Sequence, residues 1–259
     1  MVRHVLVLTT VLCMLVSCEK TEPSATFPAP SVPEVDTAFY LNLVHTFNNQ
    51  PLRFNSNYLL NVNLLKQDTI QINTFKYYLT NISLQQSDSS WLTLGETYYL
   101  VDHALPKSMK IKLTAPAGTY TSVRFLIGVD SARNVSGVQD GSLDPALGMF
   151  WTWVSGYIQA KLEGKVINRP NAVAPFIHHI GGFSGPYNPL QWIQLRFDKP
   201  VEYTADASKS ITISADTEKW FTGSQSISPL QYPVIMDPGA ECKMISENYR
   251  HMFSFVASE

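Results

Sequence analysis

The chain has 259 residues, with 19 Lys and Arg against 21 Asp and Glu, and a formal net charge of −2 at pH 7. The sequence has no cluster of Lys and Arg. It therefore argues against a protein that binds the phosphate backbone of a nucleic acid. Of the three cysteines, Cys13 and Cys18 lie near the N-terminus and leave Cys242 without a partner. A disulfide framework and a thiolate zinc or iron–sulfur site are therefore excluded.

The N-terminal segment is typical of a signal peptide. Arg3 precedes an uncharged, mostly apolar run over residues 5–16, which is shorter than the roughly 20 residues that a membrane-spanning helix needs. The run ends in Leu-Val-Ser-Cys, which resembles the bacterial lipobox, whose cysteine becomes the lipidated first residue. We predict a signal peptide over residues 1–17 and an outer-membrane lipoprotein anchored at Cys18, on the periplasmic or cell-surface side. Ordinary cleavage beside an incidental cysteine is the alternative.

A proline-rich tether is predicted over residues 18–36, because this segment carries four prolines and almost no hydrophobic periodicity. Such a composition favours an extended chain of about 3.1 Å per residue. The remaining residues, 37–259, are predicted to form one domain.

Alternation of apolar and polar residues dominates this domain and is typical of half-buried strands. In one run, Ile158, Ala160 and Leu162 share one face. Turns rich in Gly, Pro, Asn and Asp separate the runs, with no long helical pattern between them. The sequence therefore predicts an all-β fold, an antiparallel β-sandwich of about 10–12 strands with long loops. The predicted strands are 39–47, 58–65, 70–84, 97–101, 109–113, 120–129, 157–163, 176–180, 191–197, 211–215 and 252–256.

One helical turn is predicted within the domain, over residues 216–221. Asp216 would cap it. Trp220 and Phe221 would dock it onto a sheet.

Two segments carry a resemblance to a known family. Residues 128–164 read GVDSARNVSGVQDGSLDPALGMFWTWVSGYIQAKLEG, and residues 176–183 read FIHHIGGF. They are similar to the MbnP family of copper-binding proteins, in which a GVD…N.SG…G.LDP..GM.W.W.SGY…LEG run precedes a His-Ile-Gly-Gly stretch. With the opening strand around His45, the resemblance covers most of the mature chain.

The resemblance implies extracytoplasmic copper binding, with the copper as Cu(I). It also implies a tryptophan that a partner, a diheme cytochrome c peroxidase-like enzyme, oxidises to kynurenine. The chain itself is expected to be no enzyme and to store, relay or help acquire the metal. The implied metal-site residues are His45, Met149, Trp151, Trp153 and His179, with His178 and Asp144 in supporting positions.

The histidines can also be interpreted from strand geometry. His45 alternates in step with a row of apolar residues, Phe39, Leu41, Leu43 and Phe47, so in a strand it points toward the apolar face. It could be a core histidine bonded to a backbone carbonyl, or a copper ligand in an apolar shell. His178 and His179 are adjacent and face opposite sides of a strand, so one inward-facing metal takes only one of them. The motif selects His179, which leaves His178 at the surface or beside the ligands. Binding by both would need a bulge at Gly181-Gly182.

Met149, Trp151 and Trp153 fall at two-residue spacing and share one face if the strand starts that early. Aromatic core packing is the common role of such a stripe. A thioether, however, favours Cu(I). Intact indole is only a hydrogen-bond donor, whereas a ring-opened indole gains an amine and a ketone that can reach a metal. The sequence does not distinguish which tryptophan is modified.

Three other interpretations are alternatives to the hypothesis of copper binding. Asp130, Asn134, Asp140 and Asp144 could gather oxygen ligands around calcium, but Asp and Asn more often form turns. Exposed Trp and Tyr could instead bind a carbohydrate or a protein partner by stacking. Ser184 near His179 could suggest a hydrolase, but no G-x-S-x-G motif is present.

Overall fold

The computed structural model describes residues 37–62, 67–152, 156–169 and 172–259. The predicted signal peptide, the predicted lipidation site at Cys18 and the tether predicted for residues 18–36 lie outside the described residues. Val35–Glu259 form one compact unit. Among the described residues, no helix has the length and apolar character to cross a membrane.

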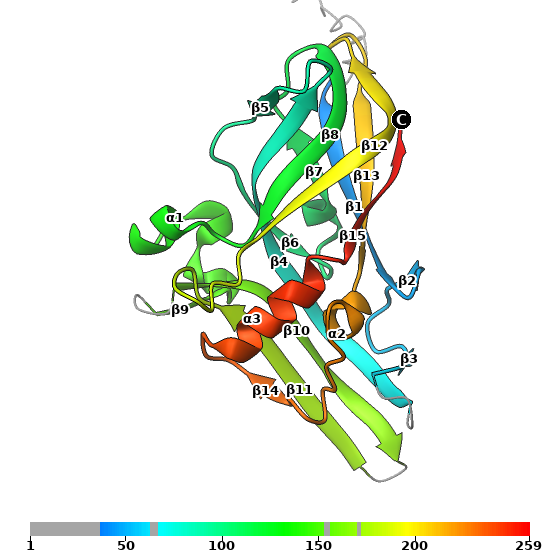
Figure 1. Cartoon of the computed structure of the whole chain (residues 1–259), viewed down its shortest axis with the longest axis vertical. Helices are drawn as coiled ribbons and strands as arrows, with labels where there is room; N and C mark the ends of the chain where they lie inside the picture. The colour runs from blue at the N-terminus through cyan, green and yellow to red at the C-terminus, as the bar shows by residue number, and fades with distance from the viewer. Residues whose placement is uncertain (1–36, 63–66, 153–155, 170–171) are drawn as a thin grey trace, which may run out of the picture. The chain divides into compact units, whose positions relative to one another are not determined.

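Two β-sheets make up the described fold (Figure 1). The smaller sheet has the order β15 (Phe253–Ser258), β13 (Lys209–Asp216), β1 (Phe39–Phe47), β2 (Gln50–Pro51), with β7 (Lys110–Leu113) also paired to β1. The larger sheet has the order β12 (Gln191–Tyr203), β8 (Gly118–Ile127), β4 (Asp68–Gln86), β10 (Gly156–Arg169), β11 (Ala172–Gly181), β14 (Val234–Ile235). To β4 are added β3 (Tyr58–Leu60), β5 (Trp91–Thr93) and β6 (Tyr98–Asp102), and to β10 is added β9 (Phe150–Thr152).

The main core lies between the two sheets, because alternate residues of each long strand point inward. On β1, Phe39 is fully buried and stacks on Tyr120 of β8 at a ring-centroid distance of 5.9 Å. Phe253 of β15 packs edge-on against Tyr77 of β4 and Phe125 of β8. Burying each such ring contributes about 1.5–3 kcal/mol. The all-β sandwich predicted from alternation is confirmed, and each predicted strand has a counterpart.

The structure differs from the predicted fold in pairing and in helix content. The pairs β1–β13 and β11–β14 are parallel, so the sandwich is not purely antiparallel. Helix α3 (Ala240–Tyr249) was not predicted, because its buried face has few apolar residues and also contains the polar Ser246 and Asn248. The predicted turn is present as α2 (Lys219–Thr222), with Trp220 and Phe221 buried. Asp216 accepts hydrogen bonds from the N–H of Glu218 and Asn48 rather than capping α2 itself.

A second, smaller core covers the other face of the larger sheet. It contains Tyr78, Val129, Leu143, Met149, Tyr157 and Ile158. The covering chain includes α1 (Ser131–Val135), two 3-10 helices (Gly141–Leu143 and Pro145–Leu147) and β9. Figure 1 shows β9 beside β10. The motif segment therefore packs on the larger sheet, on the face away from the smaller one.

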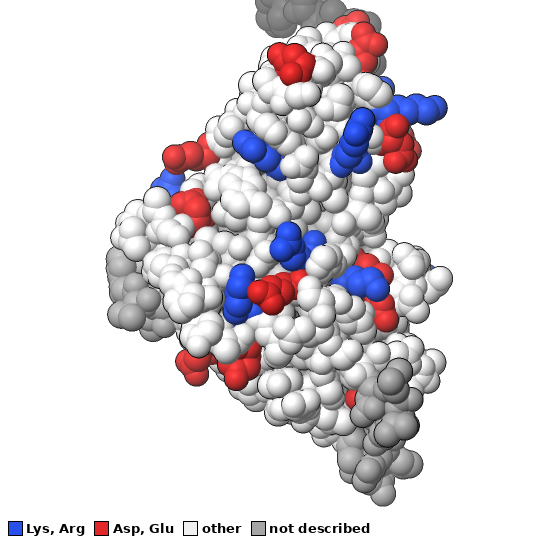
Figure 2. Space-filling view, viewed as in Figure 1, with Lys and Arg blue, Asp and Glu red and all other residues white. Residues whose placement is uncertain are grey.

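Charged side chains on the face shown in Figure 2 lie scattered, with Lys and Arg interspersed among Asp and Glu. This distribution agrees with the small net charge of the chain. No large field of one sign is seen on that face.

Candidate metal centre

His45 of β1 is buried and points into the main core, as its parity predicted. Its ring packs against Phe75 and Tyr77 of β4, with centroid distances of 4.8 Å and 5.7 Å. Its Nε2 lies 3.1 Å from the Tyr77 hydroxyl, and its Nδ1 lies 3.1 Å from Nδ1 of His103. Burial first, and then the neighbouring His103, lower the pKa of His45 to about 3, so its imidazole is neutral.

His103 was not recognised in the sequence as a candidate residue. It follows β6 directly and belongs to no apolar pattern, so only its contact with His45 reveals it. Burial lowers the pKa of His103, against opposing effects of a hydrogen bond to the Leu52 backbone and of Asp102.

His178 of β11 is a fully buried core residue rather than a surface one. Its Nδ1 accepts a hydrogen bond from the indole N–H of Trp220 at 3.1 Å, and its Nε2 donates to the Tyr232 carbonyl at 2.6 Å. Burial lowers the pKa of His178 to about 4, although the bond to Tyr232 raises it. Both nitrogens are therefore already occupied. The surface position considered for this residue is wrong, because α2 covers that face of β11.

His179 points to the opposite face, as strand alternation requires, and is also buried, with 8% of its surface exposed. Its Nε2 lies 2.6 Å from the Glu163 carboxylate of β10 and donates to it. Its Nδ1 is buried and has no hydrogen-bond partner among the residues that the structure describes. Burial lowers the pKa of His179 more than the bond to Glu163 raises it. The neutral ring then presents a bare lone pair at Nδ1.

The face around His179 is polar. Cross-strand pairing sets Asp102, Lys76, Lys161 and His179 in one row across β6, β4, β10 and β11. Lys76 pairs with Asp102 at 2.9 Å, and the Lys161 ammonium donates to the Gly148 carbonyl at 2.6 Å. Burial tends to raise the pKa of Glu163, but hydrogen bonds from His179 and Thr74 lower it overall. Glu163 is therefore held as the carboxylate that orients His179.

Trp151 of β9 lies against β11 on this same face. A Cβ built on Gly181 would approach the Trp151 indole to 2.0 Å, so the ring rests where a side chain at 181 would stand. Gly181 and His179 are two residues apart in one strand and share a face. Met149 is fully buried in the small core against which Trp151 packs. Trp153 lies outside the described residues.

The acidic loop residues hold turns. Asp144 is exposed and accepts from the Ala146 N–H at the start of a 3-10 helix. Asp130 caps α1 through the Arg133 N–H, and the Asn134 carboxamide bonds to Val129 and Tyr157. These contacts fit the turn-forming alternative to calcium binding.

The structure places His179 and Trp151 on one face of the larger sheet, with Trp151 over Gly181, and places His45 on the other side. Phe75, against which His45 packs, is aligned across the sheet with Leu162 and His178. Aligned residues share a face, so His45 and His178 lie on one side of the larger sheet and His179 on the other. In the described part of the chain, no three His, Cys, Asp or Glu residues gather as a metal-binding group. A centre at His179 would therefore depend on other donors.

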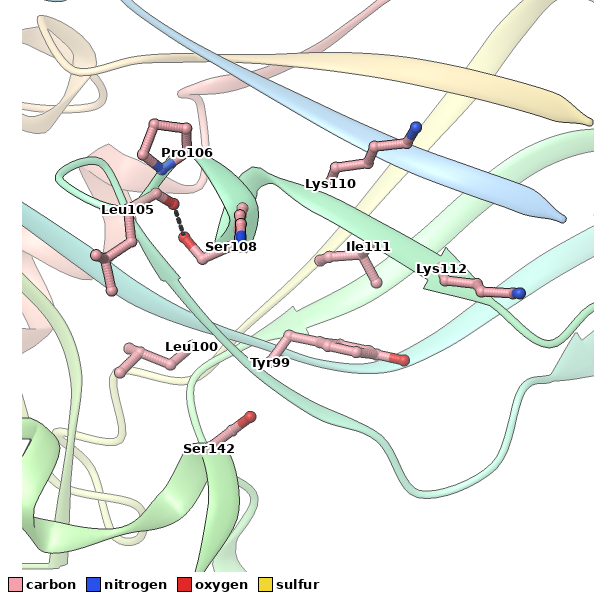
Figure 3. A pocket seen from close by; sticks show the side chains of 10 residues that line it. Tyr99, Leu100, Leu105, Pro106, Ser108, Lys110, Ile111, Lys112 and Ser142 are labelled. Carbon is pink, nitrogen blue, oxygen red and sulfur yellow. Dashed lines mark hydrogen bonds between the residues drawn. The ribbon is translucent and has the colours of Figure 1, made fainter. Parts of the chain in front are cut away.

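A cavity of about 730 Å³ lies along β6, β7 and the 3-10 helix Pro106–Met109 (Figure 3). Its apolar lining includes Leu100, Leu105 and Ile111. No residue predicted for the metal site lines it.

Comparison with known proteins finds a matching family model and a solved structure with a similar fold. The model of the MbnP family matches residues 36–237. A solved structure, MbnP from Methylosinus trichosporium, is 13% identical, covers 73% of this chain and 78% of its own, and superposes with a TM-score of 0.48. The curated proteins contain no match to the chain.

Proposed function

This chain belongs to the MbnP family, and from that membership we propose that it is an extracytoplasmic lipoprotein that binds copper as Cu(I) to store, relay or help acquire it. The proposal gives the chain no catalytic residue of its own. It assigns the copper to the face of the larger sheet that carries His179.

The observation that carries this proposal is the unpartnered Nδ1 of His179. A buried polar atom without a partner costs about 1–3 kcal/mol, and a metal ion bound to the lone pair would remove that cost. The other nitrogen donates to Glu163, which is how protein carboxylates commonly fix a metal-ligating imidazole. Imidazole nitrogen suits copper. The donor set fits the metal that the family resemblance implies.

Trp151 supplies the second part of the proposed centre. Intact indole offers only its N–H donor, so we propose that a diheme peroxidase-type partner converts Trp151 to kynurenine. Two molecules of hydrogen peroxide oxidise the indole to N-formylkynurenine and leave two waters, and hydrolysis then releases formate. The resulting aromatic amine and ketone would lie on the strand face that carries His179, because Trp151 packs over Gly181. Trp153 remains the alternative site of this modification.

His45 has no part in this centre, because it packs on the other side of the larger sheet. Met149 lies in the adjoining core and could supply a soft thioether. The proposed ligands are therefore His179 and modified Trp151, with Met149 as a third donor and Glu163 as the orienting residue.

The carbohydrate alternative is less well supported by the exposed aromatic residues. Trp192 is half exposed, but the Arg124 guanidinium lies over its ring at 5.7 Å and over Trp91 at 4.4 Å. A sugar stacks on a free ring face. The arginine already covers one face of each indole.

The test combines mass spectrometry with Cu(I) titration of the protein exported beside its diheme partner. We expect a ring-opening mass shift on the peptide containing Trp151, and we expect His179→Phe and Trp151→Phe each to weaken Cu(I) binding at this centre by about 100-fold or more. His251→Phe is the matched control, since His251 is exposed and lies far along the chain from the motif.

The proposal fails if both Trp151 and Trp153 are unmodified in protein from the native host while Phe at each position leaves Cu(I) binding unchanged. A ring-opening mass shift found on Trp153 alone would mean that the modified tryptophan is Trp153 rather than Trp151. The Cu(I) titration of His179→Phe would then still test whether His179 is a ligand.

A further inference from the structure

We infer that the cavity along β6, β7 and the 3-10 helix Pro106–Met109 binds a single-chain fatty acid, with its carboxylate held by lysines of the lining (Figure 3). The cavity contains none of the residues proposed for the copper centre, so the inference does not rest on the proposed function. Its volume of about 730 Å³ is within the range of about 300–1,000 Å³ that is usual for small-molecule sites.

The cavity lies where two strands each leave one edge unpaired. In the described part of the chain, β6 of the larger sheet pairs only with β4, and β7 of the smaller sheet pairs only with β1. Consecutive residues of each strand line the cavity: Tyr99 and Leu100 of β6, and Lys110, Ile111 and Lys112 of β7. Successive side chains of a strand point to opposite faces. A cavity that reaches all of them therefore runs along the two strand edges.

Most of the lining is apolar. Leu105 leaves 58% of its surface exposed, and a bound apolar chain would remove that surface from water. An extended peptide would need backbone partners on the strand edges, but the Ser108 hydroxyl already bonds the N–H and the carbonyl of Asp102 at the end of β6, each at 2.9 Å. An acyl chain has no polar group to satisfy, so it fits this lining better.

The charged residues of the lining are all lysines, namely Lys107, Lys110 and Lys112. No acid lines the cavity, although acids outnumber Lys and Arg in the chain by 21 to 19. All three lysines are exposed, and none forms an ion pair with a described acid. The Lys110 ammonium lies over the Tyr40 ring at 4.1 Å. Lys107 and Lys112 are therefore the cations that would bind an anionic head group.

The cavity has an apolar end and a cationic end. Figure 3 shows Leu100 and Leu105 at one end, the Lys112 side chain at the other and the Tyr99 ring between them. A ligand that matches both ends has an apolar chain and a negatively charged head, which a zwitterionic head matches less well. Exposed ion pairs contribute little to affinity. Burial of the acyl chain would supply most of the affinity, and the lysines would select the head.

The test is a calorimetric titration with sodium dodecanoate below its micelle concentration. It uses the exported chain carrying Cys18→Ala, so that no acyl group of its own competes. We expect one equivalent to bind, with an affinity that rises about fourfold for each methylene added between octanoate and dodecanoate. Dodecyltrimethylammonium has the same chain and a cationic head, and it should bind roughly tenfold more weakly or worse.

Two sets of variants test the two ends of the cavity. Leu105→Glu puts a carboxylate at the apolar end and should weaken dodecanoate binding by about tenfold or more. Leu59→Glu is its matched control, because Leu59 is 57% exposed and does not line the cavity. Lys107→Gln combined with Lys112→Gln should narrow the preference for dodecanoate over dodecyltrimethylammonium. Lys199→Gln, at an exposed position outside the cavity, should leave that preference unchanged.

The inference is overturned if dodecanoate does not bind, if its affinity is independent of chain length, or if Leu105→Glu binds it as tightly as Leu59→Glu does. Equal affinity for dodecanoate and dodecyltrimethylammonium would also overturn it, because the lysines would then not select the head group. A chain that binds no dodecanoate but dimerises, with the dimer lost in Leu105→Glu, would identify a second copy of the chain as the occupant instead.

Discussion

The two adjacent histidines on β11 differ in their hydrogen bonding. His178 has both nitrogens bonded within the main core, whereas His179 has one nitrogen on Glu163 and the other without a partner in the described part of the chain. The difference follows from strand alternation, which sends the two rings to different faces of one sheet. A satisfied imidazole stabilises the fold, and an unsatisfied one is free to bind a ligand.

We expect His178→Ala to lower the free energy of unfolding by about 3 kcal/mol, because it leaves the Trp220 N–H and the Tyr232 carbonyl unpaired and opens a cavity. Copper stoichiometry should stay unchanged in the folded variant. Chemical denaturation with a copper chelator present measures the free energy of unfolding, and metal analysis measures the copper stoichiometry. The matched change His251→Ala, at an exposed position, should stay within about 0.5 kcal/mol. Loss of copper from folded His178→Ala would show that the wrong histidine has been assigned.

At the scale of elements, α1 and the 3-10 helices hold the motif segment against the larger sheet. Asp130 is central to this, since it caps α1 through the Arg133 N–H and accepts from the Tyr98 hydroxyl at 2.5 Å. Burial alone would raise the pKa of Asp130, but the bonds from Tyr98 and Arg133 lower it below the usual 3.8. The ionised carboxylate therefore stabilises this region.

Asp130→Ala should destabilise the domain by about 1–2 kcal/mol at neutral pH, through loss of the cap. Since the folded pKa is depressed, the part of this contribution that depends on the charge is present above pH 4 and is lost as the pH falls through the folded pKa. The difference in stability between wild type and Asp130→Ala should therefore narrow at low pH, as measured by denaturant unfolding over a pH series. Asp130→Asn keeps a capping oxygen without the charge and should retain most of the stability. A gap between wild type and Asp130→Ala that persists unchanged at low pH would contradict the assignment.

For the whole molecule, the proposed anchor and the folded unit are separate parts of the chain. The compact unit spans Val35–Glu259, and the predicted lipidation site precedes it at Cys18. Stability of the unit comes from its own core between the sheets. Attachment and folding should therefore respond to different substitutions.

Cys18→Ala should move the exported protein from membranes to the soluble fraction while leaving its melting temperature unchanged, because no lipid can be added at that position. Fractionation with immunoblotting and a thermal melt measure the two effects. Cys13→Ala is the matched control, since it lies within the predicted signal peptide and should leave membrane attachment intact. If Cys18→Ala is retained on membranes as fully as wild type, the lipoprotein assignment is wrong.

The sequence by itself determined the all-β class, the positions of the long strands, the inward side of His45 and the opposite directions of His178 and His179. These follow from two-residue alternation, which is a local property of the chain. The resemblance of residues 128–164 and 176–183 likewise gave the family that the match over residues 36–237 establishes.

Only the tertiary structure decided which side chains meet. The contact of His45 with His103 joins positions 58 residues apart, and the separation of His45 from His179 depends on which face of the larger sheet each one occupies. The parallel pairing of β1 with β13 is also nonlocal. Alternation fixes the face of a residue within its strand, but strand register and the packing of sheets are set by burial across the whole core, which no local pattern records.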